Sequence, residues 1–256
     1  MVDNPRKLGR ALGIDAYARR KGHCDNTSIV DLDKGRPITT FKGRGVEDVV
    51  AWFKSRPQAE LDRVEVVVLD MSKSFYASIH QVFGDQVEVI DRCHVVQQAV
   101  GALDGVLRSS KTQLEPEEAK ELKKLRKRWL KLPNQLEVDE LIARADWRRR
   151  FPELREVLAW VQDLRKWFER KYDKPARTAL WKLIEQARES ALAPLQSVAG
   201  TLSRWFEPIV RYIRHRYTNG MTEGINNKIK LIQREAFGLR NEHNRRKRIL
   251  ADCGKT

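Results

Sequence analysis

The amino-terminal part of the chain begins with short apolar runs that are separated by turn residues. The runs are rich in β-branched residues, and Asp33, Lys34 and Gly35 separate the second run from the third. They predict a meander of three antiparallel strands, at residues 8–15, 27–32 and 37–41.

The pattern then changes to alternating helices and strands. Apolar residues at positions 46, 49, 50 and 53 recur at helical spacing and predict a helix that ends before Pro57. The continuous apolar run at 64–69 is typical of a strand buried on both faces. A helix capped by Ser72 follows it, and residues 87–90 are the candidate for a fifth strand. The order β-β-β-α-β-α-β predicts an α/β fold in which crossover helices add parallel strands to the meander.

Residues 95–217 carry no strand pattern and predict a set of helices. Interleaved aromatic and basic residues in such a segment can form a stacking surface for nucleic acid. Large aromatics can also simply fill a small helical core, and we favour this interpretation for most of them. Six of the seven tryptophans lie in this segment: Trp129, Trp147, Trp160, Trp167, Trp181 and Trp205.

Composition narrows the class of protein. The 256 residues are 41% hydrophobic and 33% charged, and they can bury a substantial core. No stretch approaches the roughly 18 apolar residues of a membrane span, and the start of the chain lacks the features of a secretory signal. Three distant cysteines offer neither a disulfide framework nor a paired zinc motif. We therefore expect a cytoplasmic protein without a membrane partner.

The net charge of +15 is distributed unevenly. Residues 1–104 contain 15 basic and 15 acidic side chains, whereas residues 105–256 contain 35 basic and 20 acidic ones. A neutral part joined to a basic part indicates that the neutral part carries out chemistry or acts as a scaffold, and that the basic part binds a polyanion. Nucleic acid is the leading candidate for this partner. The alternative is a basic but merely well-solvated helical domain.

Three carboxylates stand out by their positions. Asp15 lies in or at the end of the first predicted strand, Asp70 ends the fourth, and Glu223 lies near the start of a late helix. If the first and fourth strands pair, Asp15 and Asp70 project side by side and repel each other unless a cation lies between them. Carboxylate oxygens suit Mg²⁺ or Mn²⁺, which also bind substrate phosphates. The pattern therefore predicts a phosphoryl-transfer site.

The late helix has one polar and one apolar face. At roughly 100° per residue, Asn226, Asn227, Lys230 and Arg234 lie within about 60° of Glu223, and Met221, Ile225, Ile229 and Ile232 lie opposite. Such a helix could bury its isoleucines and direct Glu223 at a metal, with Lys230 near a phosphate. An ordinary amphipathic surface helix has the same pattern.

The segment Asp91–His94 follows the fifth predicted strand. His94 could assist at the site or orient DNA, and it could equally be a structural histidine. Zinc binding by His23, Cys24, Cys93 and His94 has no recognised spacing. Motifs for nucleotide, dinucleotide and hydrolase sites are absent from the sequence, so we expect no nucleotide cofactor.

Four stretches of the sequence, in this order, resemble the DDE catalytic domain of bacterial insertion-sequence transposases of the ISL-three family. They span nearly the whole chain and are LGIDAYARRKGH, VVLDMSKSFYASI, VIDRCHVVQQAVGALDGVLR and NGMTEGINNKIKLIQREAFGLRN, of which TEGINNKIK is the most distinctive. The resemblance implies a ribonuclease-H-like, retroviral-integrase-like mixed five-stranded sheet with a large all-helical insertion. It places a catalytic triad on Asp15, Asp70 and Glu223. Asp91 and His94 match the D-x-x-H element of several DDE transposase groups and are auxiliary candidates.

The resemblance also divides the chain. We expect the first part of the core, with five strands and two helices, at residues 1–110. A basic, tryptophan-rich helical insertion at 111–217 and a catalytic helix with a basic tail at 218–256 follow. Family members usually carry an acidic residue where this chain has Ala16, and they begin with a zinc-binding region and a helix-turn-helix. Only about seven residues precede the first strand here, so we expect a catalytic domain on its own.

The implied function is metal-dependent cleavage of DNA at transposon ends and transfer of the 3′-hydroxyl into target DNA. Asp15, Asp70 and Glu223 would hold two Mg²⁺ or Mn²⁺ ions roughly 3.5 to 4 Å apart, one activating water and the other stabilising the leaving oxygen. The implied partners are double-stranded DNA of the transposon ends and target, and a second copy in a synaptic homodimer at the nucleoid. The residues expected to contact DNA are Asn226, Asn227, Lys230, Arg234, Arg148, Arg149, Arg245, Arg246 and Lys247.

Two alternatives from other classes share these residues. A ribonuclease-H-like nuclease or resolvase would use the same carboxylates and metals but would only hydrolyse DNA. An inactive DNA-binding remnant of a transposase would keep the basic helices and lose the dependence on metal.

Overall fold

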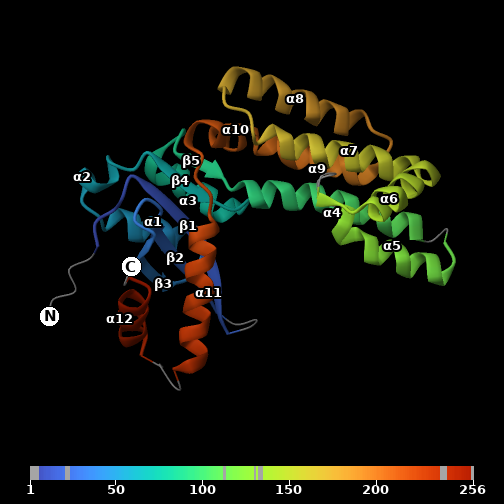
Figure 1. Ribbon diagram of the computed structural model, residues 1–256. Helices are drawn as coiled ribbons and strands as arrows, with labels where there is room; N and C mark the ends of the chain where they lie inside the picture. Colours follow the sequence, from blue (N-terminus) through green and yellow to red (C-terminus); the bar gives the residue numbers. More distant parts are fainter. Residues whose placement is uncertain are drawn as a thin grey trace. The chain divides into compact units, whose positions relative to one another are not determined.

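The computed structural model describes residues 6–20, 24–111, 114–129, 131, 135–236 and 241–254 (Figure 1). The chain divides into two compact units, one made of residues 1–94 and 207–256 and the other of residues 95–206. The first unit is therefore built from both ends of the sequence. The three-part division expected from the sequence, with boundaries after residues 110 and 217, stays a prediction.

The first unit contains a mixed five-stranded sheet, as the sequence predicts (Figure 1). The strand order is β3-β2-β1-β4-β5, with antiparallel β1–β2 and β2–β3 pairs and parallel β1–β4 and β4–β5 pairs. The strands are β1 (Ala11–Arg20), β2 (Cys24–Asp31), β3 (Arg36–Lys42), β4 (Val66–Leu69) and β5 (Glu88–Ile90).

The crossover connections contain the predicted helices. α1 (Val46–Lys54) ends before Pro57, and the short helix α2 (Gln58–Leu61), absent from the sequence prediction, lies between it and β4. All four residues of β4 are buried, as expected for a central parallel strand. α3 (Lys73–Phe83) begins at Ser72, whose hydroxyl accepts a hydrogen bond from the Phe75 amide.

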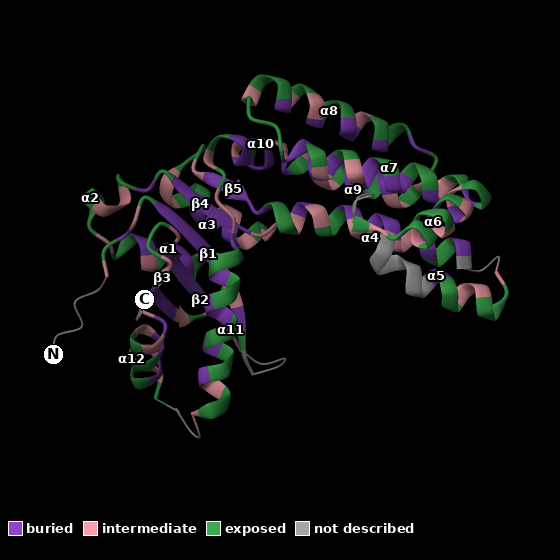
Figure 2. Ribbon diagram, in the orientation of Figure 1, coloured by how far each residue is buried: buried purple, intermediate pink, exposed green. Residues whose placement is uncertain are grey.

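Three helices follow at the carboxy-terminal end of the chain, and two of them pack on the sheet. They are α10 (Phe206–His215), α11 (Gly220–Glu235) and α12 (Glu242–Asp252). α11 contacts β1, β2 and β3, and α12 contacts β3. Between them and the sheet lies an apolar cluster that includes Tyr17, Val30, Ile229 and Ile249. Figure 2 shows that the strands are largely buried and that buried and exposed stretches alternate along α11. This cluster fixes α11 across the face of β1 to which the odd-numbered residues point.

The second unit is helical throughout its described part, as predicted. Its helices are the greater part of α4 (Arg92–Lys111), then α5 (Pro116–Trp129), α6 (Val138–Arg150), α7 (Pro152–Trp167), α8 (Asp173–Glu189) and α9 (Ala193–Arg204). None of the helices in the described residues is long and apolar enough to cross a membrane.

The tryptophans of this unit mainly fill its core. Trp147, Trp160, Trp167 and Trp205 are buried, and the indole N–H groups of Trp160 and Trp167 donate to backbone carbonyls. This confirms the core interpretation for these four residues. Trp181 is 49% exposed, and the side chain of Trp129 lies outside the described residues.

Candidate active site

Three aspartates lie in one row across neighbouring strands. Asp70 and Asp91 directly follow β4 and β5, whereas Asp15 lies in the middle of β1, which continues to Arg20 instead of ending at Asp15 as expected from the sequence. The β1–β4 register pairs Gly13 with Val68, and two residues further along it brings Asp15 beside Asp70. The β4–β5 register pairs Leu69 with Ile90, so the next residues are Asp70 and Asp91. The predicted proximity of Asp15 and Asp70 thus follows from the pairing of the strands.

Asp15 is a partly desolvated carboxylate with acidic and basic neighbours. Burial raises the pKa of Asp15 above its usual value, and the charge of Asp70 adds to this rise. Hydrogen bonds from the Ala16 amide and from Asn226, together with the proximity of His94, act in the opposite direction on this pKa. Asp15, Asp70 and His94 therefore interact electrostatically in one site.

Asn219, the residue before α11, connects this helix to the middle of β1 and to the end of β5. Its side-chain amide donates to the carbonyl oxygen of Ile14 at 3.2 Å, and its backbone N–H donates to Asp91 Oδ1 at 3.2 Å. Asn219 and Asp91 are both buried, so these bonds are shielded from water. The start of α11 is consequently held beside Asp15.

Asn226 makes a second connection, two turns further along α11. Its side-chain amide donates to Asp15 Oδ2 at 2.9 Å, and its side-chain oxygen accepts a bond of 2.7 Å from the Ser28 hydroxyl. Ser28 lies opposite Asp15 in the β1–β2 pair. Glu223 lies four residues after Asn219 and three before Asn226, so all three share one face of the helix.

Glu223 is exposed at this end of the sheet. Partial burial raises the pKa of the Cys93 thiol at the start of α4, and the negative charge of Asp91 raises it further. The charge of Glu223 makes a smaller contribution in the same direction. No group of three or more His, Cys, Asp or Glu side chains within the described residues is arranged to hold a metal ion. The Asp15–Asp70 pair nevertheless fits a divalent cation, because two coupled carboxylates offer hard oxygen ligands and a negative field.

α11 is rotated relative to the amphipathic pattern expected from the sequence. Its buried residues are Thr222, Ile225, Asn226, Ile229 and Ile232, so the isoleucines are buried as predicted. Asn226, assigned to the polar face, is 2% exposed, and Met221, assigned to the apolar face, is 49% exposed. The reason is that α11 presents the side of the helix that carries Thr222 and Asn226 to the sheet, in addition to the isoleucines.

The residues predicted to contact DNA fall into three groups by exposure. Asn227, Lys230, Arg234, Arg149 and Lys247 are exposed, and Arg148 and Arg246 are half-buried. Asn226 and Arg245 lie in the interior, where Asn226 binds Asp15 and Arg245 pairs with Glu242. The guanidinium of Arg245 is therefore not at the surface for a phosphate. Of the zinc candidates, His23 and the Cys24 side chain lie outside the described residues.

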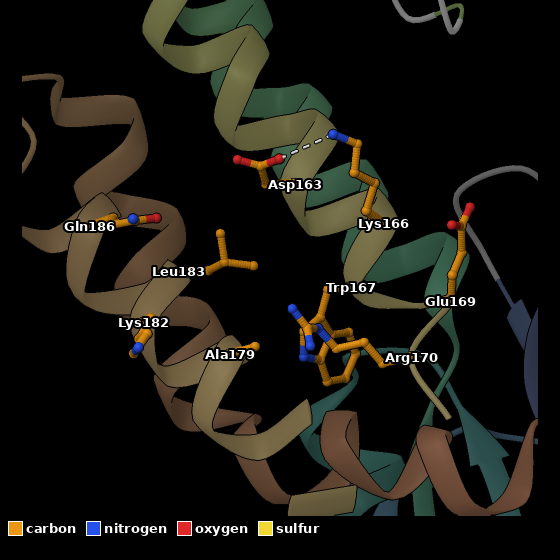
Figure 3. A pocket seen from close by; sticks show the side chains of 9 residues that line it. All are labelled: Asp163, Lys166, Trp167, Glu169, Arg170, Ala179, Lys182, Leu183 and Gln186. Carbon is orange, nitrogen blue, oxygen red and sulfur yellow. Dashed lines mark ion pairs between the residues drawn. The ribbon is translucent and has the colours of Figure 1, made fainter. Parts of the chain in front are cut away.

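A crevice of about 470 Å³ lies in the second unit, between α7 and α8 (Figure 3). Buried Trp167 and Leu183 contribute apolar surface to it, and an ion pair of Asp163 with Lys166 spans 3.5 Å. The other lining residues are Glu169, Arg170, Ala179, Lys182 and Gln186. The lining carries both signs of charge, and it contains none of Asp15, Asp70 and Asp91.

Two residues of the site were missed from the sequence. Asn219 and Ser28 carry no motif of their own, because their roles depend on which segment lies opposite them in space. The position of Asn219 as the residue before a helix was the one available signal, since asparagine is a common helix cap.

A mixed sheet with acidic side chains gathered on adjacent strands, two of them directly after their strands, defines the class of α/β proteins with an acidic site on the sheet. The sequence profile of a family described as transposase, of the ISL-three type, matches residues 12–249. The chain therefore belongs to this family of insertion-sequence transposases.

Two curated relatives agree with this assignment. The chain is 30% identical over 246 residues to the transposase for insertion sequence element IS1001 of Bordetella parapertussis, covering 90% of this chain and 58% of the relative. It is 24% identical over 255 residues to the transposase for insertion sequence element IS1557 of Mycobacterium tuberculosis, covering 90% of this chain and 57% of the relative. The chain thus spans somewhat more than half the length of these relatives.

Proposed function

We propose that this chain is the catalytic part of a DDE transposase with a ribonuclease-H-like core. It would cut DNA at transposon ends and transfer the 3′-hydroxyl into a target. The observation that best supports this function is the arrangement of α11. Asn219 and Asn226 hold this helix against the strand that carries Asp15, so Glu223 comes to the sheet end where Asp15 and Asp70 meet.

Asp15, Asp70 and Glu223 would hold two Mg²⁺ or Mn²⁺ ions. When bound, such ions polarise the phosphodiester and lower the pKa of a bound water. The carboxylates supply negative charge and hard oxygens for this purpose, and a cation relieves the repulsion between Asp15 and Asp70. His94 lies close enough to Asp15 to lower the pKa of that carboxyl, and we assign it as an auxiliary residue of the site.

The proposed reaction is two in-line displacements at phosphorus. In the first, water attacks, the P–O3′ bond breaks, and the 3′ oxygen takes up a proton to leave a free hydroxyl. In the second, this hydroxyl attacks a target phosphodiester, so one P–O bond forms as another breaks. Exposed Lys230 and Arg234 follow Glu223 along α11 and would hold phosphates of the DNA. Synapsis of two ends would require a second copy of the chain.

The function is tested with Glu223→Gln, and with Glu235→Gln at the exposed end of the same helix as control. We expect the wild-type chain and the control to bind Mn²⁺, to nick a supercoiled plasmid and to join a labelled 3′-hydroxyl oligonucleotide to it. Glu223→Gln should abolish nicking and joining but retain DNA binding, because the basic surface is unchanged.

The outcomes separate the three functions. Nicking without joining would indicate a nuclease or resolvase. DNA binding with neither Mn²⁺ binding nor nicking would indicate an inactive remnant. Undiminished nicking by Glu223→Gln would contradict the assignment of the triad.

A further inference from the structure

We propose that Asn226 is a positioning residue for Asp15, and that Ser28 orients Asn226 for this task. The inference rests on the proposed function, because it concerns the same site. Sequence reasoning placed Asn226 among the residues that contact DNA, whereas its side chain lies inside the protein and points at a carboxylate.

The contacts form a chain of hydrogen bonds from β2 through α11 to β1. The Ser28 hydroxyl donates to Asn226 Oδ1 at 2.7 Å, and Asn226 Nδ2 donates to Asp15 Oδ2 at 2.9 Å. Ser28 and Asn226 are 0% and 2% exposed. Because water has little access to either side chain, loss of one partner leaves the other without a substitute.

The ionised carboxylate of Asp15 only accepts hydrogen bonds, so the NH₂ end of the Asn226 amide faces it, and Ser28 holds the amide by its other end. A side-chain amide has an acceptor oxygen at one end and donor hydrogens at the other. With the Ser28 hydroxyl donating to the oxygen, the NH₂ group is directed at the carboxylate. The opposite orientation would place two oxygens together. Ser28 therefore acts on Asp15 through Asn226.

The result is a carboxylate held at both oxygens. The Ala16 amide donates to Oδ1 at 2.7 Å, and Asn226 donates to Oδ2. Each oxygen of an ionised carboxylate accepts about two bonds, so both keep capacity for a cation while the plane of the group is fixed. Glu223 is three residues from Asn226 on α11. The same helix therefore carries one proposed metal ligand, Glu223, and orients a second one, Asp15.

The test is titration of the metal-free chain with Mn²⁺ by calorimetry, together with thermal unfolding. Loss of a partner that orients a metal ligand typically weakens affinity by about 10- to 100-fold, and we expect this of Asn226→Ala. Ser28→Ala should weaken it in the same direction. The double variant should be no weaker than Asn226→Ala, because both substitutions interrupt one chain of bonds.

Asn26→Ala is the matched control. Asn26 is another buried asparagine of the same unit, 0% exposed, and its amide donates to Tyr17 and to Glu242 of α12 instead of Asp15. We expect this variant to lose thermal stability but to keep the wild-type Mn²⁺ affinity, which separates positioning from general destabilisation.

Wild-type Mn²⁺ affinity in both Asn226→Ala and Ser28→Ala would overturn the inference and leave the proposed function intact. If Asn226→Ala does not fold, Ser28→Ala alone decides between the two outcomes, since it removes only a hydroxyl. Absence of Mn²⁺ binding in the wild-type chain would overturn the proposed metal site, and the inference with it.

Discussion

Asp15 shows that a side chain suited to binding a cation can destabilise the fold that carries it. Burial and the charge of Asp70 favour the protonated form, so the folded pKa of Asp15 lies above its unfolded value of about 3.8. The native state then binds the proton more tightly than the unfolded state. Stability from this group is present below the unfolded pKa and is lost as pH rises through the folded pKa.

Asp70→Asn should therefore stabilise the metal-free protein at neutral pH. The variant keeps an Oδ1 acceptor for the Ser72 amide, which Asp70 binds at 3.0 Å, and removes one cause of the raised pKa of Asp15. Each 1 kcal/mol regained raises the unfolding temperature by about 2–4 °C in a domain of this size. The measurement is thermal unfolding in EDTA across a series of pH values from acid to neutral.

The gain in Asp70→Asn should grow as pH rises through the ionisation of Asp15, and stabilisation by Mg²⁺ should be lost. Asp62→Asn, an exposed carboxylate after α2, serves as control and should melt like the wild-type chain at each pH. A lower unfolding temperature for Asp70→Asn at every pH would contradict the argument that the two carboxylates repel.

At the scale of elements, the position of α11 depends on a glycine in β1. A Cβ atom at Gly13 would lie 2.7 Å from Asn219 Oδ1 and 2.9 Å from Leu32 Cδ2, and closer still to Thr222 Oγ1. Gly13→Ala should therefore push α11 from the sheet, lower the free energy of unfolding by about 1–3 kcal/mol and abolish nicking, because Glu223 moves with the helix. Denaturant unfolding and the plasmid assay measure both effects.

Gly224→Ala is the control for this prediction. Gly224 lies exposed within α11, and a Cβ there has no neighbour within 4 Å. Alanine should increase stability by about 0.5–1 kcal/mol through its higher helix propensity. If Gly13→Ala unfolds at the same denaturant concentration as the wild-type chain, the close approach of α11 to β1 is not required.

The sequence predicted most elements within a few residues, because strand and helix periodicity are local properties. It ended the first strand at Asp15, five residues before the end of β1 at Arg20, and it missed the short helix α2. The rotation of α11 was not predictable in this way. Asn226 and Met221 exchanged their expected environments because the sheet, and not the helix pattern, decides which arc is covered. The contacts of Asn219 with Ile14 and Asp91 were likewise inaccessible, since they join residues far apart in the sequence.

At the scale of the whole molecule, the site requires the chain to return to its first unit after the helical segment. Arg211 of α10 contributes to this return, because its guanidinium donates to the carboxylate and the backbone carbonyl of Glu88 at 3.1 and 3.2 Å. Glu88 is fully buried at the start of β5 and needs this partner. Asp15 and Asp70 are far from Glu223 in the sequence. They can belong to one site because both ends of the chain build the first unit.

The excess of positive charge predicts DNA binding that depends strongly on salt and little on sequence. Each side chain that neutralises a phosphate contributes about 0.9 to the slope of log K against log salt concentration. Lys230→Ala and Arg234→Ala should each reduce this slope by about 1, because both cations are exposed on α11 along the turns that follow Glu223. Fluorescence anisotropy with a labelled duplex at several salt concentrations measures the slope.

Lys54→Ala provides the control, since it removes the same charge from an exposed position at the end of α1. If only net charge mattered, all three variants would weaken binding alike. If α11 lies along the DNA backbone, Lys54→Ala keeps the wild-type slope while the α11 variants lose about one unit each. Equal slopes for all three would place the DNA elsewhere and remove Lys230 and Arg234 from the proposed contact surface.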